Sequence, residues 1–283
     1  MSSEEDLRIP LCFLSREAHE TTFRFAEQMA RDNKHYRICI CIDNETPPPG
    51  IYPLFEYDAT LVEVLAVTRA EAEEHGFLGS VDHCNSRACS RDMALYHFCC
   101  KETALKTPMW FIEDDVFIPT TATVRDMDAA YGLDADLLCA SHTIKRNGDD
   151  GGYWSQWPKI EGRIDLPWAY SMICAVRVSP ALLAYVREYA ALKGRLLFDE
   201  ALFNTLALQN GLRVETPREL ENITFTFCEF PYEKIDDARC MYHPARHRWE
   251  HETLRAKFVD AAAATAAKKS ECKNDCECKT DCK

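Results

Sequence analysis

The feature that most constrains the fold is an alternation of short apolar runs with amphipathic stretches through residues 9–116. The apolar runs are too short for membrane helices and are rich in Ile, Val, Leu, Phe and Cys, which is typical of buried strands. Helical patterns separate them, so the sequence predicts βαβ-like units and an α/β sheet with mostly parallel strands. The predicted strands are 9–15, 36–43, 61–68 and 108–115, and the predicted helices are 17–33 (with Ser15 as its N-cap), 69–75 and 87–105.

The second half is more mixed. Ser179 followed by Pro180 predicts a helix start, and Gly194 marks its end. A further helix is predicted over 198–211, and three more strands over 135–142, 168–178 and 223–230. We therefore expect a single α/β domain over 1–257, with a mixed, mostly parallel central sheet flanked by helices, followed by an Ala/Lys-rich helix and a Cys-rich tail over 258–283.

The net charge of −13 excludes one function class in particular. Sequence-independent binding to nucleic acid needs a basic surface, so we expect no nucleic-acid partner. The N-terminal MSSEEDLRIP lacks the basic and apolar regions of a signal peptide, and no run reaches the ~18 apolar residues of a membrane span. The expectation is a cytoplasmic protein without an intrinsic membrane span.

Three consecutive acids, Glu113, Asp114 and Asp115, follow the apolar run that begins at Met109. Ligands of open α/β sheets bind beyond the carboxyl ends of the strands, which is where these acids fall. Hard oxygen ligands at this spacing suit Mg²⁺ or Mn²⁺, which would also bind a phosphate. A solvated turn after a strand is the alternative, but large apolar residues on both sides favour a metal site.

The run MWFIEDDVF (109–117) resembles the DXD-type motif of the GT-A glycosyltransferases, of which EDD is a variant. The resemblance extends over roughly residues 7–245, because other segments fall in the matching order. These are FLSR (13–16), CIDN (41–44), NSRACSRDMA (85–94), FDEALFNTLA (198–207) and MYHP (241–244).

The resemblance implies a GT-A-like catalytic domain and a Mn²⁺ (or Mg²⁺) cofactor. Asp115 and His243 would bind the cation, with Asp114 at the ribose or a metal-bound water and Glu113 in support. Asp199 or Glu200 would accept the proton of the acceptor hydroxyl. The remaining residues assigned to the nucleotide sugar are Ser15, Arg16, Asp43, Arg87, Arg91 and Trp168.

Each of these residues also has an ordinary structural interpretation. Asp199 is a possible N-cap of its helix, with Glu200 a first-turn acid favoured by the helix dipole. His243 sits in an Arg-rich segment typical of exposed surface, and Asp43 suits a turn. Arg87 and Arg91 lie one helical turn apart and are possible partners of Asp92 and Glu102.

Aromatic residues crowd the segment 148–170, which contains three tryptophans. Rings beside glycines suit a mobile cover over a sugar, whereas packing onto the core is the usual fate of a single tryptophan. We expect at least one ring to line the acceptor site.

The cysteines fall into two groups. Eleven are scattered, and those inside apolar runs are expected to be buried free thiols. Cys272, Cys276, Cys278 and Cys282 form a C-x3-C-x-C-x3-C tail that matches no reliable zinc pattern and is expected to be disordered, or ordered only by a metal.

The sequence thus predicts a metal-dependent glycosyltransferase that moves a sugar from a UDP- or GDP-linked donor to a hydroxyl of a glycan or glycoprotein acceptor. A metal-dependent nucleotidyltransferase is the first alternative, although FLSREAHE lacks the Gly-rich, basic phosphate loop such enzymes use. A catalytically degenerate GT-A binding module is the second.

Overall fold

The computed structural model describes residues 7–43, 55–81, 87–102, 105–147, 149 and 154–259. Residues 260–283 of the expected Ala/Lys-rich helix and Cys-rich tail lie outside these ranges. Within the described ranges, no helix combines the length and the apolar character needed to cross a bilayer.

The core of the molecule is a seven-stranded sheet in the order β3-β2-β1-β4-β8-β5-β9. Strand β8 runs antiparallel to both neighbours, and every other pairing in this sheet is parallel. The predicted α/β class with a mixed, mostly parallel sheet is confirmed. The strands are β1 Ile9–Ser15, β2 Tyr36–Ile42, β3 Val62–Val64, β4 Met109–Glu113, β5 Leu137–Leu138, β8 Ala175–Val178 and β9 Val214–Glu215, and a separate antiparallel pair is formed by β6 Thr143–Lys145 and β7 Trp168–Tyr170.

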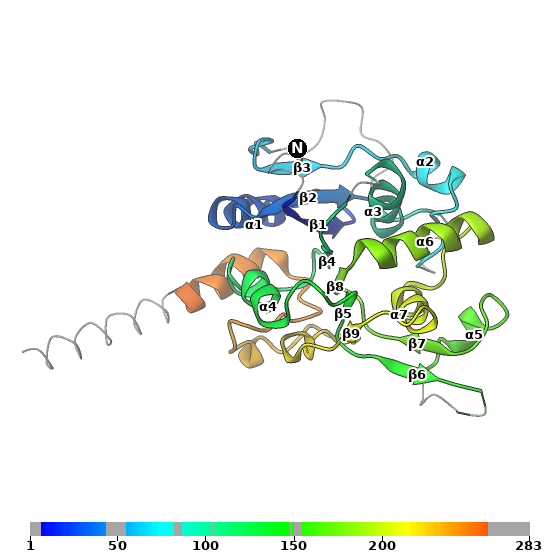
Figure 1. Cartoon of the computed structure of the whole chain (residues 1–283). Helices are drawn as coiled ribbons and strands as arrows, with labels where there is room; N and C mark the ends of the chain where they lie inside the picture. The colour runs from blue at the N-terminus through cyan, green and yellow to red at the C-terminus, as the bar shows by residue number, and fades with distance from the viewer. Residues whose placement is uncertain are drawn as a thin grey trace, which may run out of the picture.

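Helices cover both faces of the sheet (Figure 1), with α1 and α4 on one face and α3, α6 and α7 on the other. The helices are α1 Glu20–Asp32, α2 Arg69–Glu74, α3 Ser90–Tyr96 with the π-helical turn η3 His97–Lys101, α4 Thr123–Tyr131, α5 Trp157–Ile160, α6 Pro180–Lys193 and α7 Asp199–Gln209. Short 3-10 turns at Arg218–Leu220, Tyr232–Lys234 and Arg248–Glu250 precede a last helix over 251–259.

The strand residues alternate between two hydrophobic cores, as the pleat of a strand requires. In β1, Leu11 and Phe13 pack with α1 and α4, whereas Cys12 and Leu14 face the side of α3, α6 and α7. Because both faces are covered, the central strands read as continuous apolar runs. The expected buried thiols are confirmed at Cys12, Cys39, Cys41, Cys139 and Cys174.

The predicted start and end of the helix after β8 are confirmed. The Ser179 side chain accepts a hydrogen bond from the Leu182 amide at 3.1 Å, and Gly194 ends α6 with φ +65°. That left-handed backbone is one glycine adopts without a steric penalty.

Several expected elements differ from the structure. The strand expected over 168–178 is two strands, β7 in the separate pair and β8 in the main sheet, and the strand expected over 135–142 is only β5. Ser15 does not cap a helix, since it still pairs with Ile42 in the sheet and α1 begins only after His19. The predicted strand 223–230 is absent because Phe225 and Phe227 are exposed, so their alternation has no core to face. The strand expected over 61–68 is only Val62–Val64, and the helix expected over 87–105 starts at Ser90 and ends in the π-helical turn.

Candidate functional site

The sheet order changes direction at β1, which places β2 on one side and β4 on the other. At such a point the connections diverge and leave a crevice beyond the carboxyl ends of the strands. Ser15 ends β1, Ile42 ends β2 and Glu113 ends β4, so the residues that follow them meet at this crevice. The acid run, segment 13–16 and the described part of segment 41–44, which ends at Asp43, therefore converge although they are far apart in the sequence.

A cavity of about 510 Å³ occupies this position. Seven of the predicted site residues line it: Arg16, Asp43, Arg91, Glu113, Asp114, Asp115 and Asp199. Carboxylates outnumber guanidinium groups among its lining residues, so the site's own charge does not by itself favour an anionic ligand. A phosphate-bearing ligand would need an accompanying cation here.

The Asp114 side chain links the end of β1 to the C-terminal segment that contains Arg248. One carboxylate oxygen accepts a hydrogen bond from the Ser15 hydroxyl, and the other accepts one from Arg248 Nη2 at 2.6 Å. Burial raises the pKa of Asp114, and the Arg248 guanidinium only partly offsets that effect. Both oxygens are thus engaged within the protein, which favours a positioning role over the ribose or water contact expected from the sequence.

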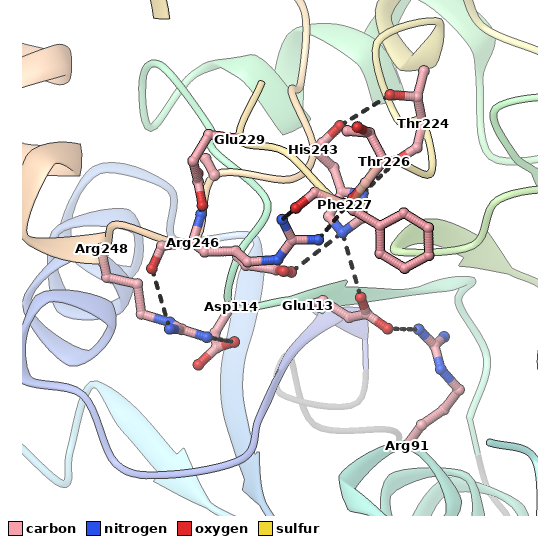
Figure 2. A network of polar contacts seen from close by, with 12 residues as sticks. Arg91, Glu113, Asp114, Thr224, Thr226, Phe227, Glu229, His243, Arg246 and Arg248 are labelled. Carbon is pink, nitrogen blue, oxygen red and sulfur yellow. Dashed lines mark hydrogen bonds and ion pairs between the residues drawn. The ribbon is translucent and has the colours of Figure 1, made fainter. Parts of the chain in front are cut away.

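Glu113 connects two parts of the site (Figure 2). One oxygen accepts a hydrogen bond from Arg91 Nη2 at 2.6 Å, and the other lies 3.9 Å from His243 Nε2. Arg91 is buried, and its Nε lies 3.5 Å from an Asp199 carboxylate oxygen. Its Nη1 is buried without a hydrogen-bond partner among the described residues. Arg91 therefore pairs with Glu113 and Asp199, not with the Asp92 and Glu102 side chains considered from the sequence.

Asp199 is the titratable group best placed for proton transfer. It is the first residue of α7, whose N-cap is Phe198, so it is not the cap considered from the sequence. Burial raises the pKa of Asp199 to about 7, even though the nearby Arg91 guanidinium acts in the opposite direction. A carboxylate whose pKa matches a neutral working pH suits a general base.

Glu200, the other candidate base, does not line the cavity. Its carboxylate accepts a hydrogen bond from Trp154 Nε1 at 2.9 Å, and burial raises its pKa. The Trp154 ring stacks on Tyr170 at a centroid distance of 4.4 Å. Glu200 thus positions an aromatic cluster next to Asp199, and the structure separates the two adjacent acids into different environments.

His243 is buried and not on the exposed surface that the neighbouring arginines indicated. Its Nδ1 lies 2.7 Å from the Thr224 carbonyl oxygen, which only accepts, so Nδ1 carries the proton and donates it. Nε2 then faces Asp115, 3.5 Å from its Oδ1. Burial alone lowers the pKa of His243, but the Asp115 carboxylate outweighs it and the pKa is raised, while the imidazole correspondingly lowers that of Asp115.

The donors around His243 fit a divalent cation. Asp115 and Glu113 supply carboxylate oxygens, and the fixed Nδ1–H leaves Nε2 to act as a ligand. Separations of 3.5 and 3.9 Å are long for hydrogen bonds, but ligands ~2.1 Å from a tetrahedral ion lie about 3.4 Å from one another.

Five predicted residues do not line the cavity: Ser15, Arg87, Trp168, Glu200 and His243. Ser15 and His243 still contact its lining residues Asp114 and Asp115, whereas Arg87 and Trp168 lie away from it. Arg87 is exposed and donates from Nε to Glu73 at 2.8 Å. Trp168 is buried in β7, where its Nε1 donates to the Ile164 carbonyl and its ring packs on Trp157. Asp43 does line the cavity, with its carboxylate held by Arg69 Nη2 at 2.7 Å.

Three basic residues of the cavity were not predicted as site residues: His19, Arg246 and Arg248. The two arginines follow His243 in the segment ARHRWE, which is basic in an otherwise acidic chain, and that contrast is the signal that could have identified them. Arg246 Nη2 donates to the Thr226 carbonyl at 2.9 Å, and its backbone amide donates to Glu229 (Figure 2). It thereby fixes the 224–230 loop beside the cavity.

Comparison with known proteins does not assign the chain to a family. No family model matches the sequence, and a search of curated proteins found no match.

Proposed function

We propose that this chain is a metal-dependent glycosyltransferase with a GT-A-type arrangement, which moves a sugar from a nucleoside-diphosphate donor to a hydroxyl of a glycan or glycoprotein. One observation carries the proposal. The cavity at the sheet's switch point combines an acidic strand end, a buried arginine with an unused nitrogen and a carboxyl group with a pKa of about 7. A metal-dependent sugar transfer with base catalysis at the acceptor hydroxyl uses each of these three functions.

The donor's diphosphate would be bound by the arginines of the cavity. Arg91 Nη1 has no hydrogen-bond partner among the described residues, and buried polar atoms in native proteins usually have one. Arg16, exposed at the end of β1, adds a second guanidinium at the cavity. Planar guanidinium groups recognise phosphate oxygens with two parallel hydrogen bonds, which supports a phosphate-bearing ligand.

Asp115 and His243 are the residues proposed to hold the cation, with Glu113 beside them. A divalent cation bound there would neutralise the charge that develops on the leaving nucleoside diphosphate. The protein's own contribution is to fix these side chains through the Thr224 carbonyl and through strand β4, whose first four residues are buried.

Asp199 is proposed to take the proton from the acceptor hydroxyl. Its burial keeps the pKa near 7, so that at neutral pH a large fraction is ionised yet still basic enough to accept a proton. The Trp154 and Tyr170 rings beside Glu200 provide apolar surface near this acid for the C–H face of a sugar.

The proposal is tested by thermal-shift measurements with UDP- and GDP-sugars in the presence and absence of Mn²⁺, followed by transfer assays with the donor that binds. Asp199→Asn should lower turnover by about 10²–10⁴-fold while donor binding is kept, because a general base contributes that range. Glu200→Gln is the matched control and should retain most of the activity.

Two results would redirect the proposal. Stabilisation by nucleoside triphosphates in preference to nucleotide sugars would favour a nucleotidyltransferase. Donor binding without transfer or hydrolysis under any metal condition would favour a binding module that has lost catalysis.

A further inference from the structure

Cys174 lies beside the acidic strand end, although no sequence pattern linked them. It immediately precedes β8, whose antiparallel pairing with β4 matches Ile112 with Ala175. The Glu113 amide donates to the Cys174 carbonyl oxygen at 2.7 Å, so the two residues are held next to each other across the sheet. Cys174 is buried and its thiol is free.

The side chains of Glu113, Cys174 and His243 converge. One carboxylate oxygen, the thiol sulfur and one imidazole nitrogen all lie within 4.8 Å of one another. Among the described residues, no other group of three acidic, cysteine or histidine side chains meets this criterion. Carboxylate, thiolate and imidazole are three ligand types of tetrahedral zinc centres, in which three protein ligands leave a fourth position open.

The imidazole is oriented before any ligand arrives. His243 donates from Nδ1 to the Thr224 carbonyl, and its backbone amide donates to the Asn222 carbonyl at 3.1 Å. In metal-binding histidines, a hydrogen bond from the ring nitrogen that does not bind the metal, here Nδ1, fixes the tautomer and the ring plane. Nε2 is thereby directed at the Glu113 and Asp115 carboxylates.

The surroundings of the Cys174 thiol are negatively charged and would be stabilised by a cation. The buried thiol lies beside the Glu113 carboxylate, whose negative charge a bound cation would offset. A bound cation deprotonates a coordinating thiol, and binding then releases a proton. The other thiols of the sheet, such as Cys12 and Cys39, are likewise buried but belong to no such group.

We propose that Glu113, Cys174 and His243 form a thiolate-containing site for a zinc-class cation, meaning Zn²⁺ or Co²⁺, and that Cys174 makes the site prefer such cations to Mg²⁺. Soft thiolate ligands select against Mg²⁺ and Mn²⁺, which prefer oxygen. Asp115 Oδ1 lies 3.5 Å from the same Nε2 and lines the cavity, so it supplies a hard donor on the cavity side. Cys174, not Asp115, is the residue that determines metal preference.

This inference rests on the proposed function for its catalytic meaning, but its test measures metal ligation alone. Co²⁺ is titrated into the 283-residue chain in which Cys272, Cys276, Cys278 and Cys282 are replaced by serine, because those thiols would bind Co²⁺ themselves. We expect a thiolate-to-cobalt charge-transfer absorption that saturates near one equivalent. Zn²⁺ should displace it, whereas a hundredfold excess of Mg²⁺ over Co²⁺ should not.

Three variants assign the ligands. Cys174→Ser should abolish the charge-transfer absorption, and Cys139→Ser, at another buried free thiol, should leave it unchanged. His243→Gln should weaken Co²⁺ binding at least 10–100-fold, the range for disturbing a ligand's support. Absence of the absorption in the parent protein, its persistence in Cys174→Ser, or its displacement by Mg²⁺ would overturn the proposal. The displacement arms need no variant, so a folding defect in Cys174→Ser does not remove the test. Thiolate-bound Co²⁺ in a protein without transfer activity would refute only the proposed function.

Discussion

Two buried arginines, one in the central sheet and one in a helix that covers it, differ in how completely their nitrogens are hydrogen-bonded. Arg177, in β8, uses both terminal nitrogens: Nη1 donates to Asp128 and Nη2 to the Gly132 carbonyl, each at 2.6 Å. Arg91, in α3, uses only Nη2 in this way, and its Nη1 has no hydrogen-bond partner among the described residues.

Their carboxylate partners differ as well. Asp128 is buried and also accepts from the Tyr36 hydroxyl and the Trp110 indole, so both of its carboxylate oxygens are engaged within the protein. Glu113 remains about a third exposed and lines the cavity. A closed buried network favours one packing of the fold, whereas a network with an unused donor at a cavity is available to a ligand.

The largest effect we expect comes from breaking the closed network. Arg177→Met should lower the free energy of unfolding by about 3–5 kcal/mol, because it leaves the Asp128 charge buried without a cation. Equilibrium urea unfolding measures this. Arg218→Met is the control. The Arg218 side chain is 68% exposed and its Nε lies 3.9 Å from Glu221, which is a weak surface ion pair, so the variant should change the free energy of unfolding by less than about 1 kcal/mol. Equal losses in the two variants would show that the network around Asp128 is not special.

The comparison also shows what the sequence can predict. Apolar runs with helical spacing between them are local patterns, and they located β1, β2 and β4 and the mostly parallel sheet. The acid run after β4 located the cavity of the candidate site, since strand ends of parallel sheets share one edge. Both predictions depend on neighbours in the chain and on one general rule of topology.

Partners that come from distant parts of the chain were not predictable in the same way. The pairing of Arg91 with Asp199 joins α3 to α7, and the approach of Cys174 to Glu113 follows from the antiparallel register of β8. The local pattern gave a wrong prediction for the 224–230 segment, which alternates like a strand. The carbonyls of Thr224 and Thr226 instead accept hydrogen bonds from the His243 and Arg246 side chains.

The next effect concerns the open network. Arg91→Met should weaken binding of a nucleoside diphosphate, measured by calorimetry with a divalent cation present, by about 10–100-fold. Removing hydrogen bonds from a charged donor costs about 1.5–3 kcal/mol. Stability should fall less than in Arg177→Met, because Glu113 is partly hydrated and Asp199 can take up a proton.

Arg87→Met is the matched control for this variant. Arg87 precedes Arg91 by one helical turn of sequence but is exposed and pairs with Glu73 outside the cavity. Its replacement should leave nucleotide affinity unchanged. If the two variants bind equally well, the unused nitrogen of Arg91 is not a ligand contact.

The smallest effect is on the pH dependence of turnover. It bears on the comparison of the two arginines because the Arg91 charge affects the pKa of Asp199, whereas Arg177 does not contact that residue. Asp199 acts as a base only when ionised, and its pKa is about 7. Turnover at saturating donor should therefore reach a plateau above pH 8 and fall about tenfold per unit well below pH 7. This acidic limb should be absent from the residual activity of Asp199→Asn.

In Arg91→Met the same limb should move to higher pH. The guanidinium favours the ionised form of Asp199, so without it burial and the Glu113 charge act unopposed and raise the pKa further. Arg177→Met, examined where it is still folded, should leave the limb in place because its network does not contact Asp199. A limb that moves equally in both arginine variants would mean that it reports general loosening of the fold and not the charge beside Asp199.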